Sequence, residues 1–192
     1  MILLNPRIIR YSIESKLSQM VEFLADLGLY KEWMIGKVLV KHLFIMGYNV
    51  EKRLRPTCEF LRSLGLTGSQ LQSAAINFPE ILCWDVDKTL RSNVLYLESR
   101  GFRPSQIAAV VGGYPPVLIK SARNSLGPRI KFLEQVMGRQ INEVVDYPKF
   151  FRHGLKGKLA SRKKLLTRKG VECSLTEMLE CNHKKFLLKF GM

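Results

Sequence analysis

The side chains that could perform acid–base or metal chemistry are few and scattered. The chain has three histidines, and only His183 lies near another type of metal ligand, Cys181. Two ligands do not make a zinc site, which needs three or four. Gly154 and Gly157 do not form a phosphate-binding loop, because no strand precedes them and the Gly-Lys-Ser/Thr ending is absent. We therefore expect a protein that is not an enzyme and that uses no cofactor, metal ion or small-molecule substrate.

Positive charge is the feature that points to a partner. The 192 residues include 31 Lys and Arg against 16 Asp and Glu, a formal net charge of +15. Residues 147–170 contain nine of the basic residues and no acidic residue. Leu155, Leu159 and Leu166 recur at helical spacing there, which predicts a packed helix with a basic face. A merely solvated face mixes both signs, so this composition favours a polyanionic partner, nucleic acid first and an anionic membrane surface second.

Other residues have simpler roles. Trp33 and Trp84 could stack on bases, but we expect them to be buried or half-buried in packing. The four cysteines form no Cys-x-x-Cys pair and are expected to be reduced and mostly buried. No apolar run approaches the ~20 residues that span a bilayer.

The elements that position the basic residues come from a repeat of about 36 residues. Pro6, Pro79, Pro115 and Pro148 each follow an aromatic or polar residue, and Leu43 occupies the same place in a further copy. We number positions from these five residues, which define repeat slot 0. Leucine recurs at slot +11 (Leu17, Leu54, Leu90, Leu126, Leu159) and at slot +18 (Leu24, Leu61, Leu97, Leu133, Leu166). A glycine closes each unit, at Gly28, Gly65, Gly101, Gly138 and Gly170.

Each unit predicts two helices and a tight turn. An amphipathic helix covers about slots +9 to +21, the glycine stops it, and a second helix follows before the next proline. Such a unit cannot bury its own apolar face, so the units must stack into a curved solenoid. We predict an all-α single domain over residues 1–192, with units at about 1–28, 29–65, 66–101, 102–138 and 139–170 and a cap at 171–192. The period-2 patterns of strands are missing.

The repeat resembles that of the mTERF family, the mitochondrial transcription termination factor-like proteins of animal mitochondria and plant organelles. The resemblance rests on a proline followed by leucines seven apart, as in Pro79, Leu90 and Leu97, and on Tyr147-Pro148 in the last unit. It covers essentially the whole chain and is closest in style to plant members. It implies a right- or left-handed superhelix shaped like a half-doughnut, whose basic concave groove binds double-stranded DNA, and RNA in some members.

Candidate contact residues follow from slots +8, +12 and +14, which the repeat projects onto one face. The C-terminal units are richest in basic residues at these slots. We predict phosphate contacts from Arg55, Arg91, Arg123, Arg129, Lys156, Arg162, Lys163, Arg168 and Lys169. Changing Arg162, Lys163 and Arg168 together to Glu is expected to weaken binding while leaving the melting temperature nearly unchanged.

The function implied is an organellar nucleic-acid-binding protein that clamps duplex DNA, or structured RNA, to regulate transcription termination or gene expression. A factor for organellar RNA maturation or splicing and a scaffold that binds another protein are the alternatives. We expect a monomer that does not insert into membranes, in chloroplasts rather than mitochondria. Met1 lies five residues before Pro6 and no transit peptide is present, so we expect a chain truncated at its N-terminus.

Overall fold

The described part of the chain, residues 13–191 of a computed structural model, is helical and contains no strand. Two series of α-helices alternate along it. The first series is α1 (Ile13–Asp26), α3 (Arg55–Ser63), α5 (Ser92–Ser99), α7 (Gly127–Lys131) and α9 (Ala160–Lys169). The second series is α2 (Glu32–Lys41), α4 (Gly68–Asn77), α6 (Pro104–Gly113), α8 (Asn142–Asp146) and α10 (Leu175–Leu179), and α11 (His183–Lys189) ends the chain.

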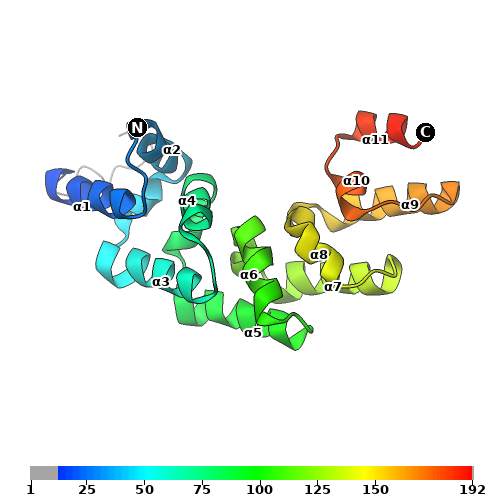
Figure 1. Cartoon of the computed structure of the whole chain (residues 1–192), viewed down its shortest axis with the longest axis horizontal. Coiled ribbons are helices and arrows are strands. Elements are labelled where there is room, and N and C mark those ends of the chain that lie inside the picture. Colours follow the sequence, from blue (N-terminus) through cyan, green and yellow to red (C-terminus); the bar gives the residue numbers. More distant parts are fainter. Residues whose placement is uncertain (1–12, 192) are drawn as a thin grey trace.

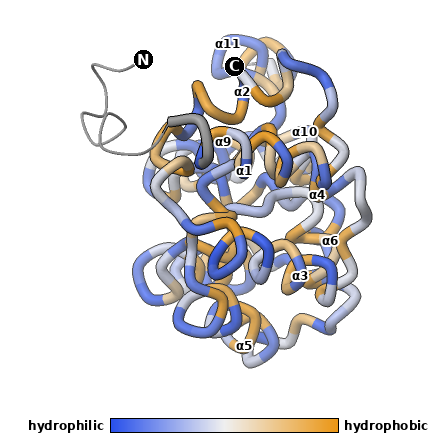
Figure 2. Tube along the Cα trace, turned by 90° about the vertical axis from the view of Figure 1, so that its left-hand side faces the viewer, coloured by the Kyte–Doolittle hydropathy of each residue, from blue (hydrophilic) through white to orange (hydrophobic). Residues whose placement is uncertain are grey.

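Figure 1 shows the helices arranged as an arch. Helices α3, α5 and α7 lie along its outer side and α4, α6 and α8 along its inner side, while α1 and α2 lie at one end and α9 to α11 at the other. Figure 2 shows that polar and apolar residues alternate along the helices, so each helix has a face to bury and a face to expose. Within the described residues, no helix is long and apolar enough to cross a membrane.

The slot 0 residues begin short 3₁₀ helices, at Leu43–Gly47, Pro79–Cys83, Pro115–Ile119 and Pro148–Arg152. Proline suits the first turn of a helix because its missing N–H would be unpaired there anyway. Leu43 starts a 3₁₀ helix without proline, so the 3₁₀ helix at slot 0 does not require the proline ring. Pro6 lies outside the described residues.

In the last four units the first helix begins with one wide π-helical turn, in which an amide donates to the carbonyl five residues earlier. These turns are Val50–Leu54, Val86–Arg91, Ala122–Leu126 and Leu155–Leu159, and another, Phe132–Val136, follows α7. In the four units the amide of the slot +11 leucine donates to the slot +6 carbonyl at 3.0–3.4 Å. The slot +6 side chains of Asn49, Asp85 and Ser121 also cap the turn by accepting an amide hydrogen.

The closing glycines stop the first helices as expected. Gly65 and Gly101 have φ of +96° and +90°, a left-handed conformation that strains any residue with a Cβ. The amides of the two residues that follow, Leu66 and Phe102, donate back to the slot +18 carbonyls. The chain therefore reverses within a few residues and lays the second helix against the first.

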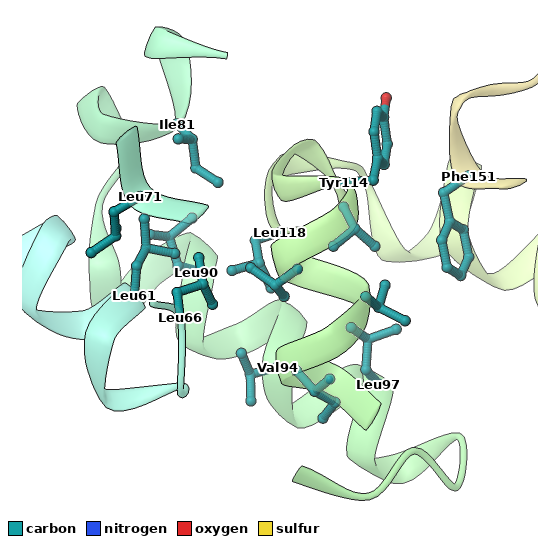
Figure 3. Close-up of a cluster of buried hydrophobic side chains, with 14 of the residues drawn as sticks. Leu61, Leu66, Leu71, Ile81, Leu90, Val94, Leu97, Tyr114, Leu118 and Phe151 are labelled. Carbon is teal, nitrogen blue, oxygen red and sulfur yellow. The ribbon is translucent and has the colours of Figure 1, made fainter. Parts of the chain in front are cut away.

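The repeated leucines form one continuous core. Leu61, Leu90 and Leu118 come from consecutive units and converge in Figure 3. At slots +11 and +18 the leucines from residue 24 onward are buried, most of them completely. Leu17 was expected in this core but is 38% exposed.

Candidate nucleic-acid interface

The nine predicted contact residues do not form one site, and three of them are exposed and unpaired. Arg123, Lys156 and Arg168 are exposed and make no hydrogen bond or ion pair with the described residues. Arg123 and Lys156 occupy slot +8, on the π-helical turns that open their units. Because a solvated cation can meet a phosphate without breaking another contact, these three residues remain candidates.

Arg55 and Arg91 are paired with acids on the protein itself. Arg55 donates to Asp26 at 2.7 Å and to Glu51 at 2.8 Å, and these two carboxylates raise the pKa of its guanidinium. Arg91 donates to Asp87 at 3.0 Å, and its guanidinium lies 5.3 Å from the centroid of the Phe60 ring. A phosphate at either arginine has to compete with a carboxylate, which weakens the case for direct contact.

The residues at slot +14 point into the next unit. Thr57 Oγ1 donates to the carbonyl of Trp84 at 3.3 Å, and Asn93 Nδ2 donates to that of Lys120 at 3.0 Å. Arg129 Nε donates to the carbonyl of His153 at 2.9 Å. All three acceptors occupy slot +5 of the following unit. Slot +14 therefore joins neighbouring units, and these hydrogen bonds give Thr57, Asn93 and Arg129 a structural role that does not require a ligand.

Arg162, the last residue at slot +14, is buried with only 3% of its surface exposed. Its guanidinium donates to the carbonyls of Met178 and Cys181 and lies 4.5 Å from the centroid of the Phe186 ring. A buried cation whose donors are satisfied by main-chain oxygens cannot contact a phosphate without unfolding its surroundings. The prediction of a phosphate contact by Arg162 is corrected: the residue anchors α10 and α11 to α9.

Lys163 and Lys169 lie on the remaining surface of α9. Lys163 is half-buried and lines a small cleft with Glu143 and Glu172. Lys169 is exposed and donates to the carbonyl of Gly191 at 3.1 Å. Lys169 keeps a solvent-facing ammonium with further donors, whereas Lys163 already faces acids.

A cluster of like charges lies where the last units meet, and the slots chosen from the sequence miss most of it. Its members are Lys120, Arg129, Arg152 and Lys158, and we call it the cationic cluster. Burial, followed by the nearby Arg129, lowers the pKa of Lys120. Burial, followed by Arg162 and Arg152, lowers the pKa of Lys158. Burial accounts for most of both shifts, and the smaller effects of Arg129 on Lys120 and of Arg152 on Lys158 place these cations near one another, as in anion-binding sites.

His153 lies among these cations and reports their field. The pKa of this imidazole is lowered to about 4, mainly because the ring is partly buried. The positive charges of Lys158 and Arg152 lower it further. The ring stacks on Tyr147 with a centroid separation of 6.1 Å, and its Nε2 lies 3.1 Å from the tyrosine hydroxyl. At neutral pH His153 is therefore uncharged and adds no repulsion to the cationic cluster.

The middle of the arch differs from the expected basic groove. Helices α4 and α6, which lie on its inner side, contain no charged residue. Positive charge near the middle therefore comes from other elements, including α3, α7 and the π-helical turns. The tryptophans also differ from expectation, since Trp33 is 58% exposed and Trp84 43% exposed.

The arrangement gathers cations that can bind an anion. Among residues 13–191 no three His, Cys, Asp or Glu side chains come together as metal ligands. Burial raises the pKa of the Cys58 and Cys83 thiols to about 12, so neither supplies a thiolate. One sequence signal could have located Lys120 and Arg152: both lie four or five residues after a slot 0 proline, a position the slot analysis left out.

Comparison with known proteins adds the family. The model of the family described as mTERF matches residues 1–187. The chain is 60% identical over 63 residues to transcription termination factor MTERF6, chloroplastic/mitochondrial, of Arabidopsis thaliana, covering 33% of this chain and 19% of that protein. It is 38% identical over 56 residues to transcription termination factor MTERF4, chloroplastic, of the same plant, covering 29% of this chain and 10% of that protein.

These alignments span a small part of each relative, at most 19% of its length. The family match is broader, because it runs through every repeat that the slots define. The all-helical structure with its recurring leucines and glycines agrees with that match. The chain therefore belongs to the mTERF family and is a homologue of plant organellar transcription termination factors.

Proposed function

We propose that this protein binds nucleic acid in an organelle through the cationic cluster and the exposed basic residues of its last unit, and that it thereby regulates transcription termination. The observation that carries the proposal is the crowding of Lys120, Arg129, Arg152 and Lys158 where the last units meet. Main-chain carbonyls hold Arg129 and Lys158 in place, and an anionic backbone would relieve the repulsion among the four cations.

Exposed lysines and arginines extend the cluster along the last unit. Arg123 and Lys156 lie between its members in sequence, and Arg168 and Lys169 follow it. Together they supply a sequence-independent hold on phosphates, as in other proteins that bind a duplex through its backbone. No catalytic step is needed, because a tightly bound protein can stop a polymerase by obstruction.

Double-stranded DNA is the partner we propose, with structured RNA as the alternative that the same backbone contacts would accept. The organellar setting is proposed from the relatives, which are named as chloroplastic or as chloroplastic/mitochondrial. Within that setting we propose the chloroplast. We also propose a monomer whose five units form one superhelical domain.

The test compares two single substitutions on the same preparation. Arg152→Ala removes an exposed cation from the cluster, and Lys37→Ala removes an exposed cation from α2, far from the cluster in sequence. We expect Arg152→Ala to weaken binding to a duplex and to reduce its salt dependence by about one counterion, while Lys37→Ala changes neither. Equal effects of the two substitutions would overturn the proposed interface. Binding that does not respond to salt would favour the scaffold alternative.

A further inference from the structure

Slot +5 carries a row of side chains at one-repeat intervals. Its residues are Tyr48, Trp84, Lys120 and His153, each directly after a 3₁₀ helix. Their backbones are nearly the same, with φ between −93° and −78° and ψ between 144° and 152°. Because the backbones match, each side chain leaves its unit in an equivalent direction, and we call this set the slot +5 row.

The neighbouring units hold the row in place. Consecutive 3₁₀ helices pack against one another at Leu43–Gly47, Pro79–Cys83 and Pro115–Ile119. The carbonyls of Trp84, Lys120 and His153 accept the hydrogen bonds from slot +14 described above. The backbone beneath each of these side chains is therefore fixed even where the side chain itself is exposed.

The chemistry of the row changes along its length. Tyr48 and Trp84 are aromatic and lie open to solvent, 41% and 43% exposed. Lys120 follows with an ammonium 5.6 Å from the centroid of the Tyr114 ring, and Arg152 stands beside the last position. Single exposed aromatic residues are common on protein surfaces. Two of them in register, continued by cations, provide two ring faces for bases and then two positive charges for phosphates of one strand.

Spacing decides which kind of strand fits. Packed helices lie about 8–10 Å apart. Stacked bases in a duplex are separated by about 3.4 Å along each strand. Rings one repeat apart therefore cannot read adjacent bases within an intact stack. They can each receive one base from an unpaired strand whose bases are splayed, as other helical-repeat proteins do at one base per repeat.

Two of the acids near the aromatic half are neutralised. Asp85 follows Trp84 directly, and its carboxylate accepts a hydrogen bond from Arg53 at 2.7 Å. Asp87 is paired with Arg91 at 3.0 Å. Glu80, on the 3₁₀ helix before Trp84, makes no ion pair with the described residues, so one carboxylate stays charged near this part of the row.

We propose that Tyr48 and Trp84 stack on unpaired bases of a nucleic-acid strand, one base per repeat, while Lys120 and Arg152 hold phosphates of the same strand. This inference rests on the proposed nucleic-acid binding and adds to the proposed duplex a second target, a single-stranded or locally opened segment.

The two tryptophans make a direct optical test possible. Trp33→Phe leaves Trp84 as the sole tryptophan, and Trp84→Phe leaves Trp33, which is exposed on α2 but outside the row. The probes are a single-stranded oligothymidylate and a duplex of equal length. We expect the oligothymidylate to quench the emission of Trp84 in a saturable way and to leave the emission of Trp33 unchanged. We expect the duplex to quench neither.

Affinity provides a second measurement. Trp84→Ala should weaken binding of the single strand roughly 5- to 150-fold, the loss expected for one base–aromatic stack. Trp84→Phe should retain most of the affinity, and Trp33→Ala should retain all of it. Thermal melts followed by circular dichroism show whether any variant loses affinity because it unfolds. If Trp84→Ala unfolds, the quenching of Trp84 and the affinity of Trp84→Phe test the inference.

The outcomes separate this inference from the proposed function. Salt-dependent binding of either probe with no quenching of Trp84 and no loss in Trp84→Ala overturns the stacking row and leaves the proposed function standing. Failure of both probes to bind overturns both. Equal quenching of Trp33 and Trp84 also overturns the row, because it would show a general surface effect.

Discussion

Residues at one repeat slot share a task even when their chemistry differs. Thr57, Asn93 and Arg129 have a hydroxyl, an amide and a guanidinium, yet each donates to the same main-chain oxygen of the next unit. The main-chain carbonyl at slot +5 can accept a hydrogen bond from any donor side chain that is long enough to reach it. Charge alone therefore misidentifies slot +14: an arginine there can serve packing as well as any neutral donor.

Arg162 shows the consequence for stability. Arg162→Ala should lower the free energy of unfolding by about 2–3 kcal/mol, because it leaves buried carbonyls without their charged donor. Arg168→Ala, at an exposed position on the same helix, should stay within about 0.5 kcal/mol of the parent. Urea denaturation of the two variants measures both values.

The joint replacement of Arg162, Lys163 and Arg168 by Glu is consequently no test of binding. It would bury an unpaired carboxylate at residue 162 and unfold the cap, contrary to the expectation of an unchanged melting temperature. Equal stability of Arg162→Ala and Arg168→Ala would contradict the anchoring role of Arg162.

His153 should make the fold sensitive to mild acid. Its pKa is lowered to about 4 in the folded chain from an ordinary value of 6.5, so the unfolded chain takes up the proton first. The contribution of neutral His153 to stability is complete above about pH 6.5 and is lost progressively as the pH falls toward 4.

We expect His153→Gln to flatten the decline in melting temperature between pH 6.5 and pH 5. Nuclear magnetic resonance titration of the parent should show one imidazole, absent from His153→Gln, that remains neutral at pH 5.5. A midpoint for that imidazole near 6.5 would show that neither burial nor the surrounding cations lower its pKa.

At the scale of the element, the repeat slots correctly predict the residues that pack the core and end the helices. Leucines at slots +11 and +18 and glycines after the first helices recur because every unit must bury the same face and turn at the same place. Trp84 and Arg162 could not be placed in this way. A ring or guanidinium on a helical pattern can face solvent or a neighbouring unit, and only the stacking of units decides which.

Leucine at slot +18 should be costly to truncate. Leu97 and Leu133 are both fully buried, so Leu97→Ala or Leu133→Ala should lower the free energy of unfolding by about 2–5 kcal/mol through the cavity left behind. Leu95→Ala is a matched control, since Leu95 lies on the same helix as Leu97 and is 58% exposed. Thermal melts with unchanged midpoints for both core variants would contradict the repeat register.

Those core losses should spread beyond one unit. Each unit of a solenoid is stabilised by its neighbours, so a cavity at Leu97 weakens the contacts of α5 with α6 and with the following 3₁₀ helix. Hydrogen exchange should show faster opening in the adjoining units as well as in α5.

At the scale of the whole molecule, charge is distributed unevenly over the arch. The net charge is +15, and the nine unopposed basic residues of 147–170 lie toward one end. Association with a polyanion should therefore begin at the end that holds α9. Helices α4 and α6 form part of the inner side but contain no charged residue that would attract a polyanion.

Binding to duplex DNA should depend steeply on salt. If about 5 to 8 phosphates are contacted, the logarithm of the association constant should fall against the logarithm of salt concentration with a slope of roughly −4 to −7. Fluorescence anisotropy over a range of potassium chloride concentrations measures the slope. A slope near zero would mean that the partner is held by apolar contacts, as in a protein scaffold.

The contacts between units have an implication for how such a chain can change over generations. Their acceptor is a main-chain oxygen, which every amino acid possesses, so no substitution at slot +5 deletes it. The side chain displayed there is free to vary while the joint beneath it persists, and Trp84, Lys120 and His153 illustrate that freedom. Repeats built this way are interchangeable modules, in which new specificity can be tried one position at a time on an unchanged frame.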